Sequence, residues 1–299
     1  MHHGYETILM RITIFGATGL LGKALMREWV QDPEDEVIGL CSKDADIRDA
    51  SRVSEVVART RPEWIVLSAA YTDVDGCETN PQLALDVNCH GAANIAQAAK
   101  QSGSRLLFVS TDYVFDGKKA SPYETTDPRA PRSAYGRSKA EAEIAVTQIL
   151  PEACIARTSW LFGTGGSCFP ETILKLAASR PTIDVVNDQR GAPTYAPDLA
   201  QAIKQLCHKN ATGIVHVTNR GECTWFEFAC EIVVRAGLPT VVRPTTSDKF
   251  VRPAERPQYS VLSLRSLEPY GITTPSWQNA LGRYLDERQI TNRTAEASK

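Results

Sequence analysis

The sequence has no long apolar run and almost no excess of charge. None of its segments approaches the roughly 20 consecutive apolar residues that a membrane-spanning helix needs. The 33 Lys and Arg residues nearly balance the 35 Asp and Glu residues, and they form neither a basic stripe nor a run of like charges. The sequence therefore argues against a membrane or a nucleic acid as a partner.

Paired cysteines and clustered histidines are also missing. The 8 cysteines form no Cys-x-x-Cys pair, and the 5 histidines show no spacing typical of metal ligands. A chain of 299 residues can bury a full core without disulfides. We therefore expect reduced thiols and no metal site. The opening segment lacks a signal-peptide pattern, so we also expect a cytoplasmic location.

What the sequence does contain is a regular alternation of β-rich runs and helical patterns from Arg11 onward. This alternation is typical of a parallel sheet covered by helices. We predict an α/β fold, with a doubly wound parallel Rossmann-type sheet and a smaller C-terminal substrate domain. The predicted strands are 11–15, 37–40, 64–67, 105–109 and 154–157, and the predicted helices are 20–30, 51–59, 81–101 and 134–150.

The alternation weakens after about residue 160, where proline-rich connections separate the helical patterns. We predict a dinucleotide-binding domain over residues 10–158, with returning segments near 183–200 and 259–263. Residues 159–290 are expected to form mainly a substrate-binding domain. Within the first domain, the proline-rich stretch 112–132 is expected to be a long loop over the edge of the sheet.

A glycine-rich turn follows the first predicted strand and opens the first predicted helix. In that position the backbone N–H groups and the helix dipole can hold the pyrophosphate of a dinucleotide. Gly16 and Gly19 leave room for the turn and for the phosphate, and Gly22 lets the helix lie close to the strand. The predicted cofactor contacts in the turn are Gly16, Thr18, Gly19, Leu20, Leu21 and Gly22.

The end of the second predicted strand bears on the choice of cofactor. An acidic residue there would bind the ribose hydroxyls of NAD, but this chain has Cys41, Ser42 and Lys43. Lys43 could pair with a 2′-phosphate, which favours NADPH, or it is a solvated loop charge, which leaves NADH open as well. Asp46 and Ile47 could flank an adenine, and the small residues Ala69 and Ala70, with Tyr71, follow the third strand where the cofactor would lie.

A candidate proton-delivery set spans two further elements. Tyr135 and Lys139 are four residues apart, and so share one face of the predicted fourth helix. An ammonium near a phenol lowers the pKa of the phenol and makes it a better proton donor at neutral pH. Thr111 ends the fourth strand at the carboxyl edge of the sheet, where open α/β sheets bind ligands, and would be a second hydrogen-bond donor to a keto oxygen.

Together these motifs resemble the extended short-chain dehydrogenases, and specifically the dTDP-4-dehydrorhamnose reductase family. The glycine turn, Ser-Thr-Asp-Tyr-Val-Phe-Asp-Gly at 110–117 and Tyr-x-x-x-Lys at 135–139 occur in the family's order, and the resemblance covers about residues 10–288. It implies reduction by NAD(P)H of the C4 ketone of a nucleotide-linked sugar, with dTDP-L-rhamnose as product. It also implies catalytic roles for Thr111, Tyr135 and Lys139.

The resemblance further implies that Trp160 contacts the hexose, although a core aromatic would fit the residue equally well. Asp112 and Tyr113 are expected at the substrate, where Tyr113 is either a sugar contact or a loop anchor. Arg256 is expected to neutralise the diphosphate of the substrate, in preference to Arg252, unless it is a surface charge.

Some features limit the transfer from the family. Certain members bind Mg²⁺ at a dimer interface through carboxylates, but Ala24 and Pro197 stand at two such positions here, so no metal is expected. A homodimer remains compatible with the resemblance. Two rival functions also stay open: a nucleotide-sugar epimerase, which uses the same tyrosine and lysine, and a non-catalytic NADP-binding subunit resembling the regulatory subunit of methionine adenosyltransferase.

Overall fold

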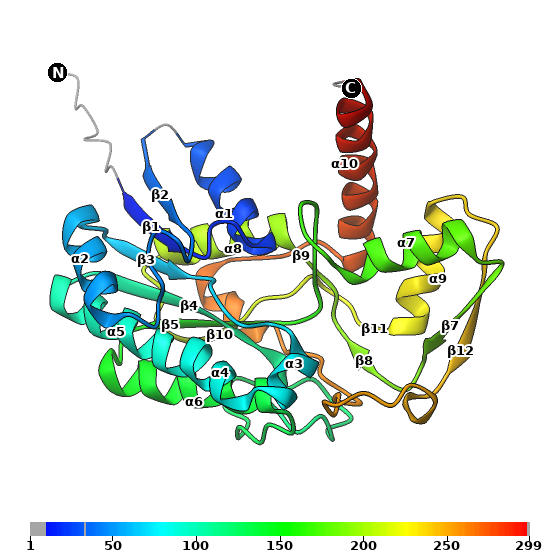
Figure 1. The fold of residues 1–299 in the computed structure, drawn as a ribbon, viewed down its shortest axis with the longest axis horizontal. Coiled ribbons are helices and arrows are strands. Elements are labelled where there is room, and N and C mark those ends of the chain that lie inside the picture. Colours follow the sequence, from blue (N-terminus) through cyan, green and yellow to red (C-terminus); the bar gives the residue numbers. More distant parts are fainter. Residues whose placement is uncertain (1–9, 33, 298–299) are drawn as a thin grey trace.

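The computed structural model describes residues 10–32 and 34–297, so residues 1–9 lie outside the described part of the chain. Its first lobe, on the left of Figure 1, is built on one six-stranded parallel sheet with the order β10-β5-β4-β3-β1-β2. No helix among the described residues is both long and apolar enough to cross a membrane. The strands of this sheet are β1 (Arg11–Phe15), β2 (Glu36–Leu40), β3 (Trp64–Leu67), β4 (Arg105–Thr111), β5 (Cys154–Thr158) and β10 (Gly213–His216).

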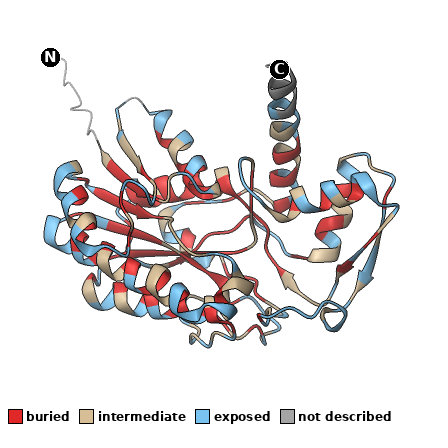
Figure 2. Cartoon of the chain, viewed as in Figure 1, coloured by how far each residue is buried: buried red, intermediate tan, exposed pale blue. Residues whose placement is uncertain are grey.

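Helices cover both faces of this sheet, and the strands between them are largely buried (Figure 2). One face packs against α1 (Leu20–Val30) and α8 (Ala196–His208). The other face packs against α2 (Ala50–Thr60), α5 (Gly91–Ser102) and α6 (Ala134–Ile149). The prediction of a doubly wound parallel sheet is therefore confirmed.

The helix predicted over 81–101 is interrupted. It consists of α4 (Pro81–Leu85), a π-helical turn η1 (Asp86–His90) and α5. The π turn contains the buried Asn88, whose side chain accepts from the Tyr71 N–H at 2.7 Å and donates to the Tyr71 carbonyl at 3.1 Å. Asn88 also donates to the hydroxyl of Ser138 on α6 at 3.0 Å. The turn thus joins the segment after β3, which includes α3 (Val74–Thr79), to α6.

The second lobe, on the right of Figure 1, has its own aromatic core. It contains α7 (Phe169–Ser179), α9 (Trp225–Arg235) and the base of α10 (Trp277–Ala297), which projects away from the body in Figure 1. Phe162 packs against Phe228 and Tyr284 at ring-centroid distances of 5.5 and 5.6 Å. The lobe therefore holds its shape through side-chain packing more than through sheet pairing.

Residues 183–186, at the start of the segment predicted to return to the first domain, do not join its sheet. These residues form β7 (Thr182–Val186), which pairs with β12 (Val241–Thr245) in a separate parallel pair. The reason is burial: Ile183 and Val185 face the core of the second lobe. The sixth strand of the main sheet is instead β10, a short segment that pairs with β5.

The rest of the segments predicted to return to the first domain differ in whether they contact the first lobe. In 183–200, the start of α8 does pack on the first lobe, against α1. Residues 259–263 do not enter the sheet and make only isolated bridges, Tyr123 with Leu262 and Arg190 with Tyr259. The division of the chain into two domains at residue 158 stays a prediction.

Short elements complete the chain: β6 (Leu161–Phe162), β8 (Arg190–Gly191), β9 (Thr194–Tyr195), β11 (Cys223–Thr224), η2 (Asp112–Val114), η3 (Ser247–Lys249) and η4 (Arg265–Tyr270).

Candidate active site

The glycine turn between β1 and α1 is shaped by close backbone contacts that leave no room for a side chain at Gly16 or at Gly22. Gly16 has φ +91°, and a Cβ on it would lie 2.5 Å from the Ala69 nitrogen. A Cβ on Gly22 would lie 2.0 Å from the Gly16 carbonyl oxygen. Gly19 begins α1 without a side-chain cap, so the first N–H groups of the helix point toward the turn. This is the geometry that holds a phosphate at a helix N-terminus.

A cavity of about 700 Å³ runs from this turn along the carboxyl ends of the strands to α6. Of the predicted cofactor and substrate residues, Lys43, Tyr71 and Arg256 do not line it. The predicted residues that do line it are Gly16, Thr18, Gly19, Leu20, Leu21, Gly22, Ser42, Asp46, Ile47, Ala69, Ala70, Thr111, Asp112, Tyr113, Tyr135, Lys139 and Trp160.

Thr111 and Tyr135 meet in this cavity although a long loop separates them in sequence. The 3₁₀ turn η2 that follows β4 packs tightly on the start of α6. The contact is so close that a Cβ on Gly136 would lie 2.3 Å from the Tyr113 carbonyl oxygen. The rings of Tyr113 and Tyr135 are edge to face, with centroids 5.6 Å apart. The Thr111 hydroxyl faces the phenol of Tyr135 and lowers its pKa in part.

The pKa of Tyr135 differs from the sequence-based expectation. Burial raises this pKa well above its ordinary value, and the hydroxyl of Thr111 offsets only part of that rise. The predicted lowering of the phenol pKa by Lys139 is not what the structure shows: desolvation is the largest effect on this pKa, and the charge of Asp112 raises it further. A phenol with this high a pKa stays protonated at neutral pH, as a proton donor must.

Lys139 is buried on α6, one helical turn after Tyr135. Its ammonium donates to the Val109 carbonyl on β4 at 2.7 Å and lies 4.0 Å from the centroid of the Phe108 ring. Burial lowers the pKa of Lys139 to about 7, and the nearby Glu143 counteracts this in part. Strand β4 therefore fixes the position of Lys139 in the cavity wall.

Asp112, at the start of η2, is a buried carboxylate in neutral surroundings. It is 2% exposed, and its Oδ1 accepts from the Thr111 hydroxyl at 3.0 Å. Its Oδ2 has no hydrogen-bond partner at bonding geometry within the described residues, although the Ser260 hydroxyl lies near it. Burial raises the pKa of Asp112 to about 6, against the weaker opposing effect of these hydroxyls and of backbone N–H groups.

A second buried carboxylate, Glu143, lies one helical turn beyond Lys139 and is fully paired. It accepts from Ser110 at 2.6 Å, from Arg157 at 2.8 and 2.6 Å and from Arg129 at 2.5 Å. Burial alone would raise the pKa of Glu143, but Arg157 and the other donors outweigh burial and hold it below its usual value. The cluster joins α6 to β4, to β5 and to the long loop. Sequence reasoning missed it because ion pairs between elements leave no local signal.

His216 of β10 extends this cluster. Its Nδ1 lies 3.2 Å from the Ser263 carbonyl, and its Nε2 lies 3.5 Å from a nitrogen of Arg157. Burial, with the charge of Arg157, lowers the pKa of His216 to about 4. The ring is therefore neutral at pH 7 and donates to the carbonyl from Nδ1.

Trp160 lies between the two lobes in a strained backbone conformation, with φ +47°. Its ring stacks on Trp225 with centroids 3.5 Å apart, and Gly191 lies against the same ring, where a Cβ would be 2.4 Å from the nearest ring atom. Trp225 also lines a second cavity of about 1140 Å³, which meets the first at Tyr113. The stacked pair thus forms part of the wall where the two cavities join.

Arg256 lines this second cavity, where Asp75 of α3 holds its guanidinium at 2.6 and 2.9 Å. Arg252 pairs with the same carboxylate at 2.8 Å. The Arg256 hydrogen bonds are the largest cause that lowers the pKa of Asp75 below its usual value. The two arginines carry one charge more than Asp75 neutralises, while the acidic residues Asp116, Asp184, Asp248 and Glu255 also line this cavity.

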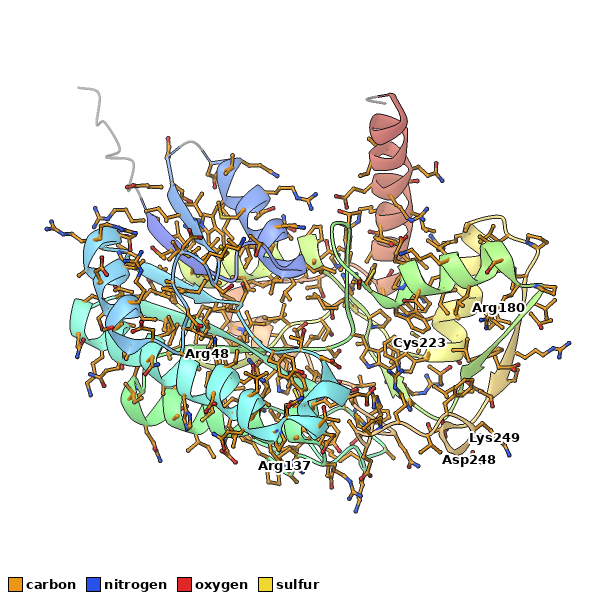
Figure 3. All side chains as sticks on the ribbon, viewed as in Figure 1. Arg48, Arg137, Arg180, Cys223, Asp248 and Lys249 are labelled. Atoms are coloured by element: carbon orange, nitrogen blue, oxygen red, sulfur yellow. The ribbon has the colours of Figure 1, made fainter. Side chains whose placement is uncertain are left out.

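On the cofactor side, the basic residue that lines the cavity is Arg48, and the predicted role of Lys43 stays a prediction. Lys43 is exposed and does not line the first cavity, but Arg48 does (labelled in Figure 3). Arg48 is bound to Asp46, with its closest nitrogen 2.6 Å from Asp46 Oδ2. Sequence reasoning passed over Arg48 because an exposed arginine before a helix is ordinary.

One group of described residues has metal-ligand spacing, Asp32, Asp35 and His208, at the opposite edge of the sheet from the cavities. The ammonium of Lys204 already lies 2.7 Å from Asp32 there, so a cation is part of the cluster. At the two family positions for Mg²⁺, Ala24 is buried in the core and Pro197 is in the first turn of α8. Neither offers a ligand atom, and the absence of a metal stays a prediction.

Fold and site together define a class of protein. A doubly wound sheet, a glycine turn after β1 and a threonine, tyrosine and lysine gathered at its carboxyl edge characterise the short-chain dehydrogenase type of oxidoreductase. Within that class, the chain belongs to the RmlD substrate binding domain family, whose model matches residues 10–290. The predicted family resemblance is thereby confirmed.

Named relatives agree over nearly the whole chain. The spore coat polysaccharide biosynthesis protein SpsK of Bacillus subtilis is 40% identical over 280 residues, which are 94% of this chain and 98% of that protein. The dTDP-4-dehydrorhamnose reductase of Mycobacterium tuberculosis is 39% identical over 283 residues, 92% of each protein. A crystal structure of dTDP-4-dehydrorhamnose reductase from Bacillus anthracis in complex with NADP has a TM-score of 0.91 and 39% identity, covering 94% of this chain and 100% of that one. The chain is therefore an oxidoreductase of this family.

A UDP-glucose 4-epimerase structure from Thermus thermophilus is more distant. It has a TM-score of 0.80 at 22% identity, covering 93% of this chain and 98% of that one. This likeness shows a shared fold and leaves the reaction open.

Proposed function

We propose that this chain reduces the C4 keto group of a nucleotide-linked 6-deoxy-sugar, converting dTDP-4-dehydro-L-rhamnose to dTDP-L-rhamnose with NADPH. The observation that carries the proposal is the meeting of Thr111, Tyr135 and Lys139 in one cavity that begins at the glycine turn. The names of the relatives in Mycobacterium tuberculosis and Bacillus anthracis support the choice of sugar.

The residues present fit a dinucleotide. The Gly16–Gly22 turn offers backbone N–H groups, with no room for a Cβ at Gly16 or Gly22, and the small residues Ala69 and Ala70 line the cavity beside it. Ser42 and Arg48 are the groups near the expected ribose phosphate, and Arg48 replaces Lys43 as the basic residue that would favour NADPH. Because Asp46 already shares the charge of Arg48, NADH would also be accepted.

When bound, the cofactor would supply the hydride that adds to C4 of the sugar. Tyr135 would give its phenolic proton to the keto oxygen, so that the ketone becomes an alcohol. Lys139, held by the Val109 carbonyl, would keep a positive charge beside the phenolate that forms. Thr111 would orient the carbonyl through its hydroxyl.

The second cavity is the proposed place for the nucleotide diphosphate. Arg256 would bind the diphosphate while Asp75 holds the guanidinium in place, and Arg252 adds charge at the rim. Trp160 would contact the hexose at the junction of the cavities, with Asp112 and Tyr113 on the other side.

The test is an assay of NADPH oxidation across a panel of keto-sugar nucleotides that differ in sugar and base. Net consumption of NADPH with dTDP-4-dehydro-L-rhamnose supports the proposal. Interconversion of sugars without net consumption would make the chain an epimerase. Absence of oxidation with every sugar, with tight binding of NADPH, would favour a non-catalytic binding subunit.

We further infer a cytoplasmic location, which is supported by the absence of disulfides among the cysteines: all eight are free thiols. A nucleotide sugar is the proposed partner, and a homodimer stays a prediction.

A further inference from the structure

The hydroxyl of Thr111 has one proton, and the structure shows where that proton goes. Thr111 Oγ1 donates it to Asp112 Oδ1 at 3.0 Å and accepts from the Tyr113 N–H at 3.2 Å. The phenol of Tyr135 faces the same oxygen. In this arrangement Thr111 has no proton left for a keto oxygen, so it cannot act as a donor to the substrate.

Asp112 accepts the Thr111 proton only while its Oδ1 carries no proton of its own. If Oδ1 is protonated, Asp112 becomes the donor and Thr111 Oγ1 the acceptor, which frees the threonine proton to point at the substrate. We propose that Asp112 is a positioning residue that sets the direction of the Thr111 hydroxyl, and that the competent enzyme has Asp112 in its neutral acid form. This inference rests on the proposed function.

The surroundings of Asp112 favour the neutral acid. It is 2% exposed, and its second oxygen lacks a hydrogen-bond partner among the described residues. The groups that act on it are the neutral hydroxyls of Thr111 and Ser260 and backbone N–H groups. Burial accordingly raises the pKa of Asp112 to about 6, so that about half of the molecules carry this proton at pH 6 and about a tenth at pH 7.

Charged and titratable groups of the neighbouring elements do not change this picture. Tyr135 and Tyr113 both have pKa values raised by burial and stay neutral at pH 7. On α6, Lys139 donates a hydrogen bond to the Val109 carbonyl and has its pKa lowered by burial to about 7, and beyond Tyr113 the guanidinium of Arg256 is held by Asp75. The protonation state of Asp112 is thus the one that directly sets the direction of the Thr111 hydroxyl.

The proposal predicts a distinct pH profile. In the wild type, kcat/KM for the keto-sugar should fall about tenfold per pH unit above the pKa of Asp112. In Asp112→Asn the amide nitrogen donates permanently to Thr111, so the part of the limb set by Asp112 should be absent. The titration of Lys139, whose pKa is about 7, is common to both proteins and cancels from their ratio, so the ratio of variant to wild type should rise about tenfold per pH unit above the pKa of Asp112. Asp127→Asn is the matched control, because Asp127 belongs to the same loop but pairs with Lys119, and its profile should follow the wild type.

A second measurement does not need turnover. The infrared difference spectrum between wild type and Asp112→Asn should show the C=O stretch of a protonated carboxyl at pH 5 that disappears by pH 8. A ratio of variant to wild type that stays constant with pH, or absence of the protonated band, would overturn the proposal. If the wild type reduces no keto-sugar, the proposed function fails, and the band alone decides the claim about Asp112. A thermal melt of each variant checks folding.

Discussion

Two buried carboxylates accept hydrogen bonds from neighbouring residues of β4, but they differ in their ion pairs and in the direction of their pKa shifts. Glu143 accepts from Ser110, and Asp112 accepts from Thr111. Glu143 has two arginines and a lowered pKa, whereas Asp112 forms no ion pair among the described residues and has a raised pKa. The comparison indicates that the protein neutralises a buried charge where it needs rigidity, and leaves one unpaired where a proton must move.

The largest effect is expected at Tyr135, which lies in the same cavity as Asp112. Tyr135→Phe removes the phenolic proton and should lower turnover by about 10²- to 10⁴-fold, the range typical of a lost general acid. The affinity for NADPH should change little, because the ring and the helix remain. Steady-state kinetics and a cofactor titration measure both quantities, and unchanged turnover would remove Tyr135 from the mechanism.

In the ion-paired cluster around Glu143, the substitution Glu143→Gln leaves Arg157 buried without its counter-charge. We expect the free energy of unfolding to fall by about 3–5 kcal/mol at pH 7. Since the pKa of Glu143 is lowered in the folded state, its contribution is present at neutral pH and is lost as pH falls through that pKa. The deficit of the variant should therefore shrink on acidification, which urea unfolding at several pH values can measure.

Asp112→Asn should show the opposite pH dependence. The pKa of Asp112 is raised to about 6 from 3.8, so its stabilising contribution is full below pH about 4 and is lost as pH rises through about 6. Relative to wild type, the variant should gain about 3 kcal/mol of stability between those limits. A stability difference that is constant with pH would mean that the two carboxylates do not differ in the way described.

The smallest effect is expected for Arg129→Gln. Arg129 is the partly exposed member of the Glu143 cluster, with 29% of its side chain accessible, and Arg157 still neutralises Glu143 in its absence. A loss of about 1 kcal/mol or less and turnover within about twofold of wild type are expected. A loss as large as that of Glu143→Gln would show that both arginines are needed to neutralise the charge.

The parts of this picture that sequence could predict are those with local signals. The turn from Gly16 to Gly22 is a contiguous motif, and the spacing of Tyr135 and Lys139 fixes one helical face. The meeting of Thr111 with Tyr135 followed from a general rule, that ligands bind at the carboxyl edge of a parallel sheet. The sheet itself followed from the alternation of strands and helices.

The parts that sequence could not predict depend on contacts between distant elements. The pairing of Glu143 with Arg157 joins a helix to a strand, and Asn88 reaches Tyr71 only because of a π turn. The choice between Lys43 and Arg48 depends on which side chain lies along the cavity, and periodicity does not reveal that. Even the family resemblance gave no sign that Asp112 holds the proton of Thr111.

The most direct test of the account follows a labelled hydride. NADPH carrying deuterium at the transferable position of its nicotinamide is incubated with the enzyme and dTDP-4-dehydro-L-rhamnose, and the product is examined by NMR. The account predicts one deuterium on C4 of the product with the wild type, and slow or no labelling with Tyr135→Phe. A sugar that turns over without acquiring the label, or equal labelling by the variant, would contradict it.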